Sequence, residues 1–256
     1  MSLEGIVPER EPKRRAALGE PLLAYAAAIA IAVVLFWGAR ALAVVQQLMQ
    51  GAIACAFLFG PQLAARLSGR PFDPPSAGIG LQPVGRGLRV LAAALLATWP
   101  VFILGFFVYY QAACSSDGLL SAWARQFVPI CSSWRGLAGG HLRLPDDFLV
   151  LALSQILVVA VPEEVFFRGY LLARFEERWP SRSRFLGASV GAPLVVTSVL
   201  FALGHFLVDL QPARLAVFFP ALAFGWMRSR SGSIAPGAVF HALCNLLSEV
   251  LHDSFF

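Results

Sequence analysis

The sequence predicts an all-α fold: a polytopic membrane helix bundle with about seven transmembrane helices and a polar site inside the membrane. Hydrophobic residues make up 58% of the 256 residues and charged residues only 14%, and the mean hydropathy is +0.69. Soluble domains carry about 25% charged residues. Here the apolar residues are also gathered in runs near the roughly 20 residues that cross a bilayer. These observations exclude a soluble enzyme, a disordered chain and a nucleic-acid-binding module, despite the net charge of +5.

A charged N-terminal segment, residues 1–19, precedes the first apolar run. The residues Ala41-Leu42-Ala43 after that run mimic the cleavage site of a signal peptide. Because the leader is long and a second run follows at once, we expect an uncleaved anchor. The expected spans are residues 20–39, 41–65, 88–110, 147–178, 186–208, 212–228 and 233–251. Residues 20–146 then hold N-terminal helices and an extracytoplasmic loop, 111–146, and residues 147–256 form the helical core with the polar site.

The fourth run is the longest. Pro145-Asp146-Asp147 marks its start, with an Asp side chain expected to cap free backbone N–H groups. At about 1.5 Å per residue, a helix over 147–178 is longer than the membrane is thick. Its end, with Arg174 and Arg178, should therefore project into the cytoplasm.

Basic residues predict the orientation, because cytoplasmic loops are enriched in Lys and Arg. With the N-terminus inside, 14 basic residues lie inside and five outside. The use of Arg for 19 of 20 basic residues is typical of a GC-rich bacterial genome, so we expect the bacterial cytoplasmic (inner) membrane. The inside set is Arg10, Lys13, Arg14, Arg15, Arg66, Arg70, Arg86, Arg89, Arg174, Arg178, Arg182, Arg184, Arg228 and Arg230; the outside set is Arg40, Arg125, Arg135, Arg143 and Arg214.

The four cysteines fall into two pairs by position. Cys114 and Cys131 share the loop 111–146, and an extracytoplasmic loop permits a disulfide. They are therefore disulfide candidates, with no part in catalysis. Cys55 and Cys244 fall within spans, where cysteine behaves as a small hydrophobe.

A few polar side chains lie deep in the expected spans, where ionisable groups are costly and mark function. Residues four apart share a helix face, which allows Glu164 to pair with Arg168 and leaves Glu163 free to point elsewhere. A structural ion pair, or hydrogen bonds that hold helices together, would explain each group singly. Their occurrence together favours a site. The set is Glu163, Glu164 and Arg168 in the fourth span, His205 in the fifth, and His241 and Asn245 in the seventh.

Depth along the helices tests whether these groups can meet. Glu163 comes out about 20–24 Å from the outer surface and His241 about 12 Å from the inner one, which nearly coincide in a core of roughly 30 Å. His205 comes out nearer the outside unless residues 184–192 lie along the interface. Pro193 would favour such a break.

Two carboxylates, two imidazoles and an amide in an apolar cavity can carry out acid–base chemistry. A carboxylate can take a proton from water, an imidazole can return it, and N–H donors can stabilise an oxyanion. No covalent nucleophile is evident. Zinc is an alternative, with Glu163, His205 and His241 as ligands beside a water, although the sequence lacks an HExxH motif.

Three ordered motifs resemble a known family. Glu163-Glu164-Val-Phe-Phe-Arg168-Gly169-Tyr-Leu-Leu matches EExxxR-G-x-L-L, Phe201-Ala-Leu-Gly-His205 matches FxxxH, and His241-Ala-Leu-Cys-Asn245 matches HxxxN. Over residues 147–250 the chain is similar to the CAAX protease and bacteriocin-processing (CPBP, or Abi) family of intramembrane endopeptidases. Residues 1–146 carry no motif.

The resemblance implies intramembrane hydrolysis of a peptide bond by a glutamic protease without a metal cofactor. Glu163 and His205 would activate water, His241 and Asn245 would form the oxyanion site, and Glu164 and Arg168 would support them. One branch of the family, the myxosortases, suggests as substrate a membrane-anchored protein, an exported protein with a C-terminal sorting tail. The alternatives are a scaffold or chaperone without protease activity, and a proton-coupled transporter.

Overall fold

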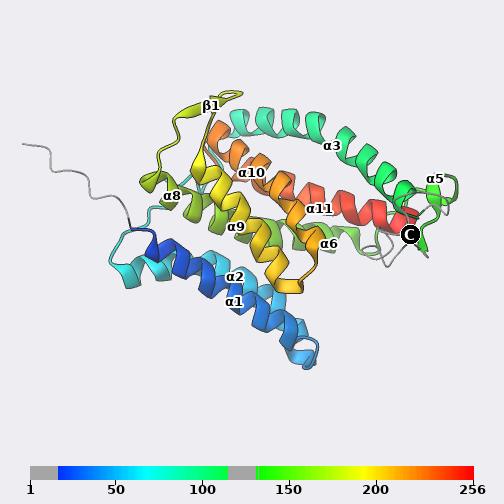
Figure 1. The fold of residues 1–256 in the computed structure, drawn as a ribbon, viewed down its shortest axis with the longest axis horizontal. Coiled ribbons are helices and arrows are strands. Elements are labelled where there is room, and N and C mark those ends of the chain that lie inside the picture. The colour runs from blue at the N-terminus through cyan, green and yellow to red at the C-terminus, as the bar shows by residue number, and fades with distance from the viewer. Residues whose placement is uncertain (1–16, 115–130, 132) are drawn as a thin grey trace, which may run out of the picture.

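The computed structural model describes residues 17–114, 131 and 133–256 (Figure 1). The described part is helical apart from one small hairpin. Its α-helices are α1 (Gly19–Gly38), α2 (Ala43–Ser68), α3 (Val84–Cys114), α5 (Gly136–Gly139), α6 (Phe148–Ser154), α7 (Val161–Glu164), α8 (Leu172–Arg178), α9 (Ala192–Asp209), α10 (Phe218–Ser231) and α11 (Ala235–Phe255). The π-helical segments η2 (Gln155–Ala160) and η3 (Val165–Leu171), the 3₁₀ helix η4 (Pro212–Val217), and the strands β1 (Ser183–Phe185) and β2 (Ala188–Val190) complete it.

The protein is a multi-pass membrane protein, as its composition predicts. Five helices of the described chain are long and apolar enough to cross a bilayer: α1, α2, α3, the continuous helix Phe148–Arg178, and α9. The other two expected spans do not meet that standard. The span expected at 212–228 is shortened because η4 takes up its first residues, and the 14 residues of α10 reach only about 21 Å. The 21 residues of α11 are long enough but less apolar.

The helix Phe148–Arg178 contains two π-helical segments that the sequence reading did not anticipate. It begins where expected, but Asp147 lies in a left-handed conformation (φ 54°) and its side chain makes no capping hydrogen bond, so that prediction was wrong. Pro162 lacks an N–H, and in a regular α-helix its ring would collide with the carbonyl four residues earlier. The wider turns of η2 directly precede it, and π-turns of this kind are frequent at functional sites.

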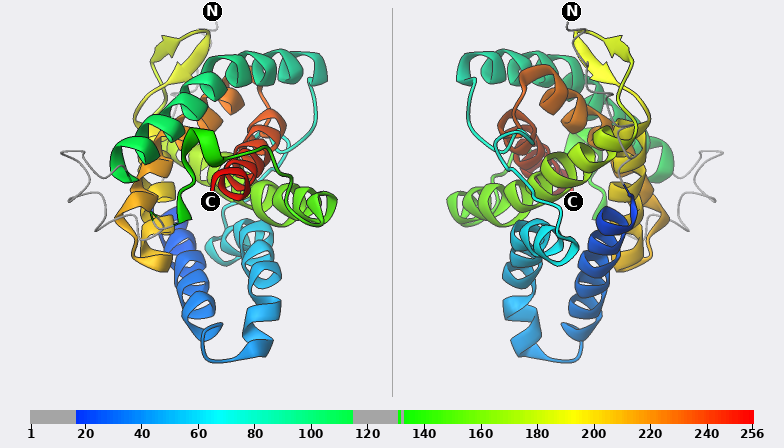
Figure 2. Two further views of the ribbon diagram at one scale, coloured as in Figure 1. Left: turned by 90° about the vertical axis from the view of Figure 1, so that its right-hand side faces the viewer. Right: turned by 90° about the vertical axis from the view of Figure 1, so that its left-hand side faces the viewer.

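The helices pack in layers around the helix 148–178. Helices α1 and α2 form a hairpin that contacts α9 and the helix 148–178, whereas α3 packs against α10 and α11 on the other side (Figure 1). Figure 2 shows the α1–α2 pair projecting from the other helices. The centre is aromatic, with buried Phe166, Phe167, Tyr170, Phe201 and Phe224 in one cluster.

The antiparallel hairpin β1–β2 replaces the start of the expected fifth span. Ser183 pairs with Val190, and Gly187 takes the left-handed conformation (φ 78°) that the turn requires. The hairpin rests on α10, because Ser189 N–H donates to Ser229 Oγ at 2.9 Å. Helix α9 therefore begins only at Ala192, with Pro193 in its first turn. This is the break that the depth of His205 requires.

One end of the bundle is tied together by ion pairs. Glu20, at the start of α1, accepts from Arg70 at 2.7 Å and from Arg174 of α8, while Arg228 of α10 pairs with Glu176 at 2.6 Å. These groups come from the segments whose basic residues predict a shared, cytoplasmic side. The chain end marked C lies at the opposite end of the bundle (Figure 1).

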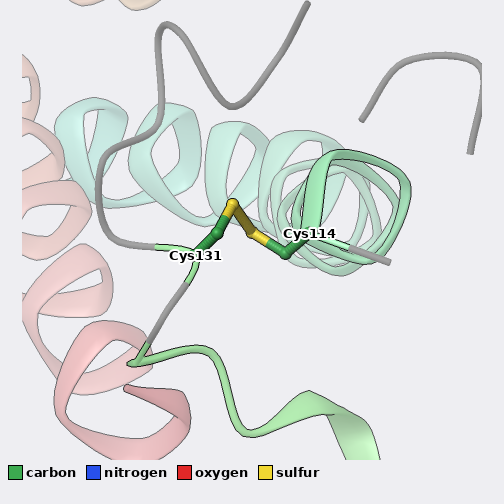
Figure 3. The surroundings of a disulfide bond; sticks show 2 residues. All are labelled: Cys114 and Cys131. Atoms are coloured by element: carbon green, nitrogen blue, oxygen red, sulfur yellow. A yellow bond between two sulfur atoms is a disulfide. The ribbon is translucent and has the colours of Figure 1, made fainter. Parts of the chain in front are cut away.

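The opposite end is held by a disulfide and by the last residues of α11. Cys114, at the end of α3, is bonded to Cys131 (Figure 3). Arg135 N–H donates to the carbonyl oxygen of Phe255 at 2.9 Å, and Trp134 stacks on Tyr110 with ring centroids 5.4 Å apart. The end of α3 and the end of α11 are therefore joined around this segment.

Candidate functional site

The buried carboxylate of Glu164 is paired with Arg168. The two side chains are 0% and 2% exposed, and Arg168 Nη1 donates to Glu164 Oε1 at 2.8 Å. Arg168 Nη2 donates to the Ala221 carbonyl at 3.1 Å. The guanidinium carbon also lies 4.3 Å from the ring centroid of Phe201 and 4.9 Å from that of Phe224. The pair predicted from the i, i+4 spacing is therefore fastened to both α9 and α10.

His241 of α11 lies between the two carboxylates. Its Nδ1 is 3.4 Å from Glu164 Oε1 and its Nε2 is 3.8 Å from Glu163 Oε2. The ring stacks on Phe224 with centroids 4.7 Å apart, which holds its plane. Adjacent carboxylates on one helix thus face different atoms of the same imidazole, and Glu163 points away from the Glu164–Arg168 pair.

This site concentrates polar atoms that lack hydrogen bonds. In the described part of the chain, four buried side-chain N or O atoms have no hydrogen-bond partner, and three of them are Glu163 Oε2, Glu164 Oε2 and His241 Nδ1. The 3.4 Å approach of His241 Nδ1 to Glu164 is close enough for attraction but does not satisfy hydrogen-bond geometry. Native proteins leave few buried polar atoms unsatisfied, so the cluster is unusual for a purely structural core.

Glu163 and His205 line one cavity of about 300 Å³. Its walls come from α1, α2, the helix 148–178 and α9, and they are mostly apolar, with side chains such as Ile29, Phe57 and Phe167. At the end of α9 the cavity reaches Asp209 and Arg214, whose side chains pair at 2.7 Å. The first two members of the predicted catalytic set therefore line the same space between helices.

The tautomer of His205 follows from its backbone contact. Its Nδ1 lies 3.0 Å from the carbonyl oxygen of Phe201, one turn earlier on α9. A carbonyl oxygen can only accept, so Nδ1 carries the proton of the neutral ring and Nε2 keeps its lone pair. The other ring nitrogen, Nε2, can then accept a proton.

Asn245 does not line the cavity. Its Nδ2 donates instead to Oε1 of Gln155, at 2.8 Å, at the start of η2. Gln155 is absent from the set of residues predicted from the sequence. The sequence does contain a sign of it, because the polar Gln155 interrupts the apolar run Leu149–Val159.

The proposed zinc set was tested against these positions. No group of three or more His, Cys, Asp or Glu side chains within residues 17–114, 131 and 133–256 is arranged to hold a metal ion. Glu163, His205 and His241 therefore do not form a zinc site as they lie.

The comparison with protein families bears on the same residues. Residues 145–247 match the family described as type II CAAX prenyl endopeptidase Rce1-like. That family is one of proteases, and the matched range holds all of the motif residues from Glu163 to Asn245. The match covers less than half of the chain and leaves out α1, α2 and α3. No curated protein and no solved structure matches the chain.

Proposed function

We propose that the protein is an intramembrane endopeptidase in which Glu163 and His205 activate water to hydrolyse a peptide bond of a membrane-anchored protein. The observation that carries the proposal is the shared cavity. A carboxylate and an imidazole with an available nitrogen line a mostly apolar cavity between four helices. Such a space can take an apolar polypeptide segment and place water beside a base.

In the proposed reaction, the Glu163 carboxylate takes a proton from water as the water oxygen adds to the peptide carbonyl carbon. The C–N bond of the tetrahedral intermediate then breaks, and the proton passes through His205 Nε2 to the leaving amine. General acid–base catalysis of this kind contributes about 10²–10⁴-fold. His241, whose Nε2 lies 3.8 Å from Glu163 Oε2, is assigned as one N–H donor to the oxyanion, and Asn245, one turn further along α11 and outside the cavity wall, as the other.

Glu164 and Arg168 are assigned a supporting role. Their pair is almost fully buried and is fastened to α9 and α10, and it meets the far side of the His241 ring. This arrangement holds His241 and Glu163 in place without contact with the substrate. A site held by rigid neighbours is what precise proton transfer requires.

For the substrate we propose an exported protein with a C-terminal membrane tail, as in the myxosortase branch. The cavity reaches Asp209 and Arg214 at the end of α9 that the positive-inside rule assigns to the outer face. The disulfide at the outer end of α3 suits an oxidising compartment. A deletion strain should accumulate an uncleaved, membrane-retained precursor. If every C-terminally anchored protein is processed normally, this substrate class is wrong.

Glu163→Gln tests the activity itself. It keeps the shape of the side chain and removes the base, so we expect cleavage of a candidate tail peptide by purified protein to fall at least about 10²-fold. Glu249→Gln is the matched control, because Glu249 is an exposed glutamate on α11. A Glu163→Gln protein that cleaves at the wild-type rate refutes the proposal. If the Glu163→Gln protein keeps its function in cells, a scaffold is favoured instead. If this variant loses a pH-dependent flux, a transporter is favoured.

A further inference from the structure

Gln155 makes a polar contact inside a membrane span. It lies in the first turn of η2, and its Oε1 accepts a hydrogen bond from Asn245 Nδ2 at 2.8 Å, between residues 90 positions apart. Both side chains are half-buried. Hydrogen bonds between transmembrane helices hold them together, each with a modest contribution to stability. That contribution alone would make Gln155 a structural residue.

The direction of this bond gives Gln155 a second effect. Gln155 presents its oxygen, which can only accept, and the bond therefore holds the nitrogen end of the Asn245 amide toward the helix 148–178. The nitrogen carries two hydrogens, and the bond to Gln155 uses one of them. The other stays available as a donor in a direction that the first bond determines.

The local helix geometry brings Gln155 to this position. Gln155 opens the π-helical segment η2, whose i→i+5 turns shift the faces of the helix between Gln155 and Glu163. Segment η2 packs along α11, and α7, which follows η2 in the chain, also packs against α11. Asn245 follows His241 by one turn on α11, so Gln155 and Glu163 reach the same face of α11 at successive levels.

We propose that Gln155 is a positioning residue of the site: it orients the Asn245 amide so that an N–H is presented to the developing oxyanion. The inference rests on the proposed function. Gln155 itself touches neither the substrate nor the reacting atoms. Loss of the acceptor frees the amide to rotate, and a small misplacement of a catalytic donor can cost about 10²-fold in rate.

The experiment compares substitutions that keep or remove the acceptor. Gln155→Leu and Gln155→Met fill similar space without an acceptor, and we expect kcat to fall roughly 10- to 100-fold with KM unchanged. Gln155→Glu keeps an acceptor oxygen in either protonation state and should stay within about threefold of wild type. Tyr25→Phe is the matched control, because it removes a different interhelical hydrogen bond, Tyr25 OH to the Leu200 carbonyl at 2.8 Å.

A double-mutant cycle separates positioning from general stability. In an Asn245→Ala background, Gln155→Leu should cause no further loss of kcat, because the group it orients is absent. The inference is overturned if Gln155→Leu and Gln155→Met keep wild-type kcat, if Gln155→Glu fails as badly as they do, or if the losses at Gln155 and Asn245 are additive. The proposed function itself fails if the Glu163→Gln protein cleaves the tail peptide at the wild-type rate, and this result is distinguishable from the outcomes at Gln155.

Discussion

Replacing Arg168 by Ala should leave the Glu164 carboxylate as an uncompensated charge in the middle of the bundle. The two side chains are 2% and 0% exposed, so the pair is shielded from solvent. Removing one partner of a buried ion pair costs about 3–5 kcal/mol. The change also empties the space between Phe201 and Phe224 and removes the hydrogen bond from Arg168 to the Ala221 carbonyl. The loss is a large fraction of the roughly 5–15 kcal/mol that typically separates folded from unfolded protein.

The assay is the yield of membrane-inserted protein and its thermal unfolding in detergent. We expect Arg168→Ala to express poorly and to unfold at a clearly lower temperature, with cleavage lost as well. Arg184→Ala, which removes an exposed arginine of β1, is the control and should behave as wild type. The double variant Glu164→Gln/Arg168→Met removes both charges and should recover much of the stability. Wild-type yield and unfolding temperature for Arg168→Ala would refute the reasoning.

Two further predictions concern the chemistry and the packing of the site. Cleavage should persist in the presence of a chelator, and the purified protein should hold no stoichiometric zinc; zinc lost together with activity would make Glu163, His205 and His241 ligands instead. Gly237→Ala should leave activity close to that of the wild type, because the added methyl would lie at ordinary contact distances, 3.4 Å from Glu164 Oε2 and 3.5 Å from the Phe224 carbonyl oxygen. A large loss of kcat in this variant would show that α11 cannot take even a methyl group beside Glu164.

Local patterns carried much of the prediction. Apolar runs of about 20 residues are a property of the chain itself, and they located five membrane helices to within a few residues at most ends. The spacing of Glu164 and Arg168 predicted their ion pair, because residues four apart on a helix are neighbours wherever the helix lies. The ordered motifs also indicated the protease family that residues 145–247 match.

Features that depend on packing between distant segments were not predictable in this way. The hairpin β1–β2 takes the place of the expected start of the fifth span, and it is hydrogen-bonded to α10. The 3₁₀ helix η4 takes the place of the expected start of the sixth span. The capping expected of Asp147 was also wrong, because its backbone takes the left-handed conformation and its side chain makes no capping hydrogen bond.

The sequence by itself determined the class of protein and the identity of the polar groups, because hydropathy and helical spacing act over a few turns of one chain. Only the tertiary structure decided which of those groups meet. It set His241 between Glu163 and Glu164, gave Glu163 and His205 a common cavity, and joined Asn245 to Gln155. These contacts join helices far apart in the chain, and π-turns and the angles at which helices pack determine them, neither of which has a local sequence period.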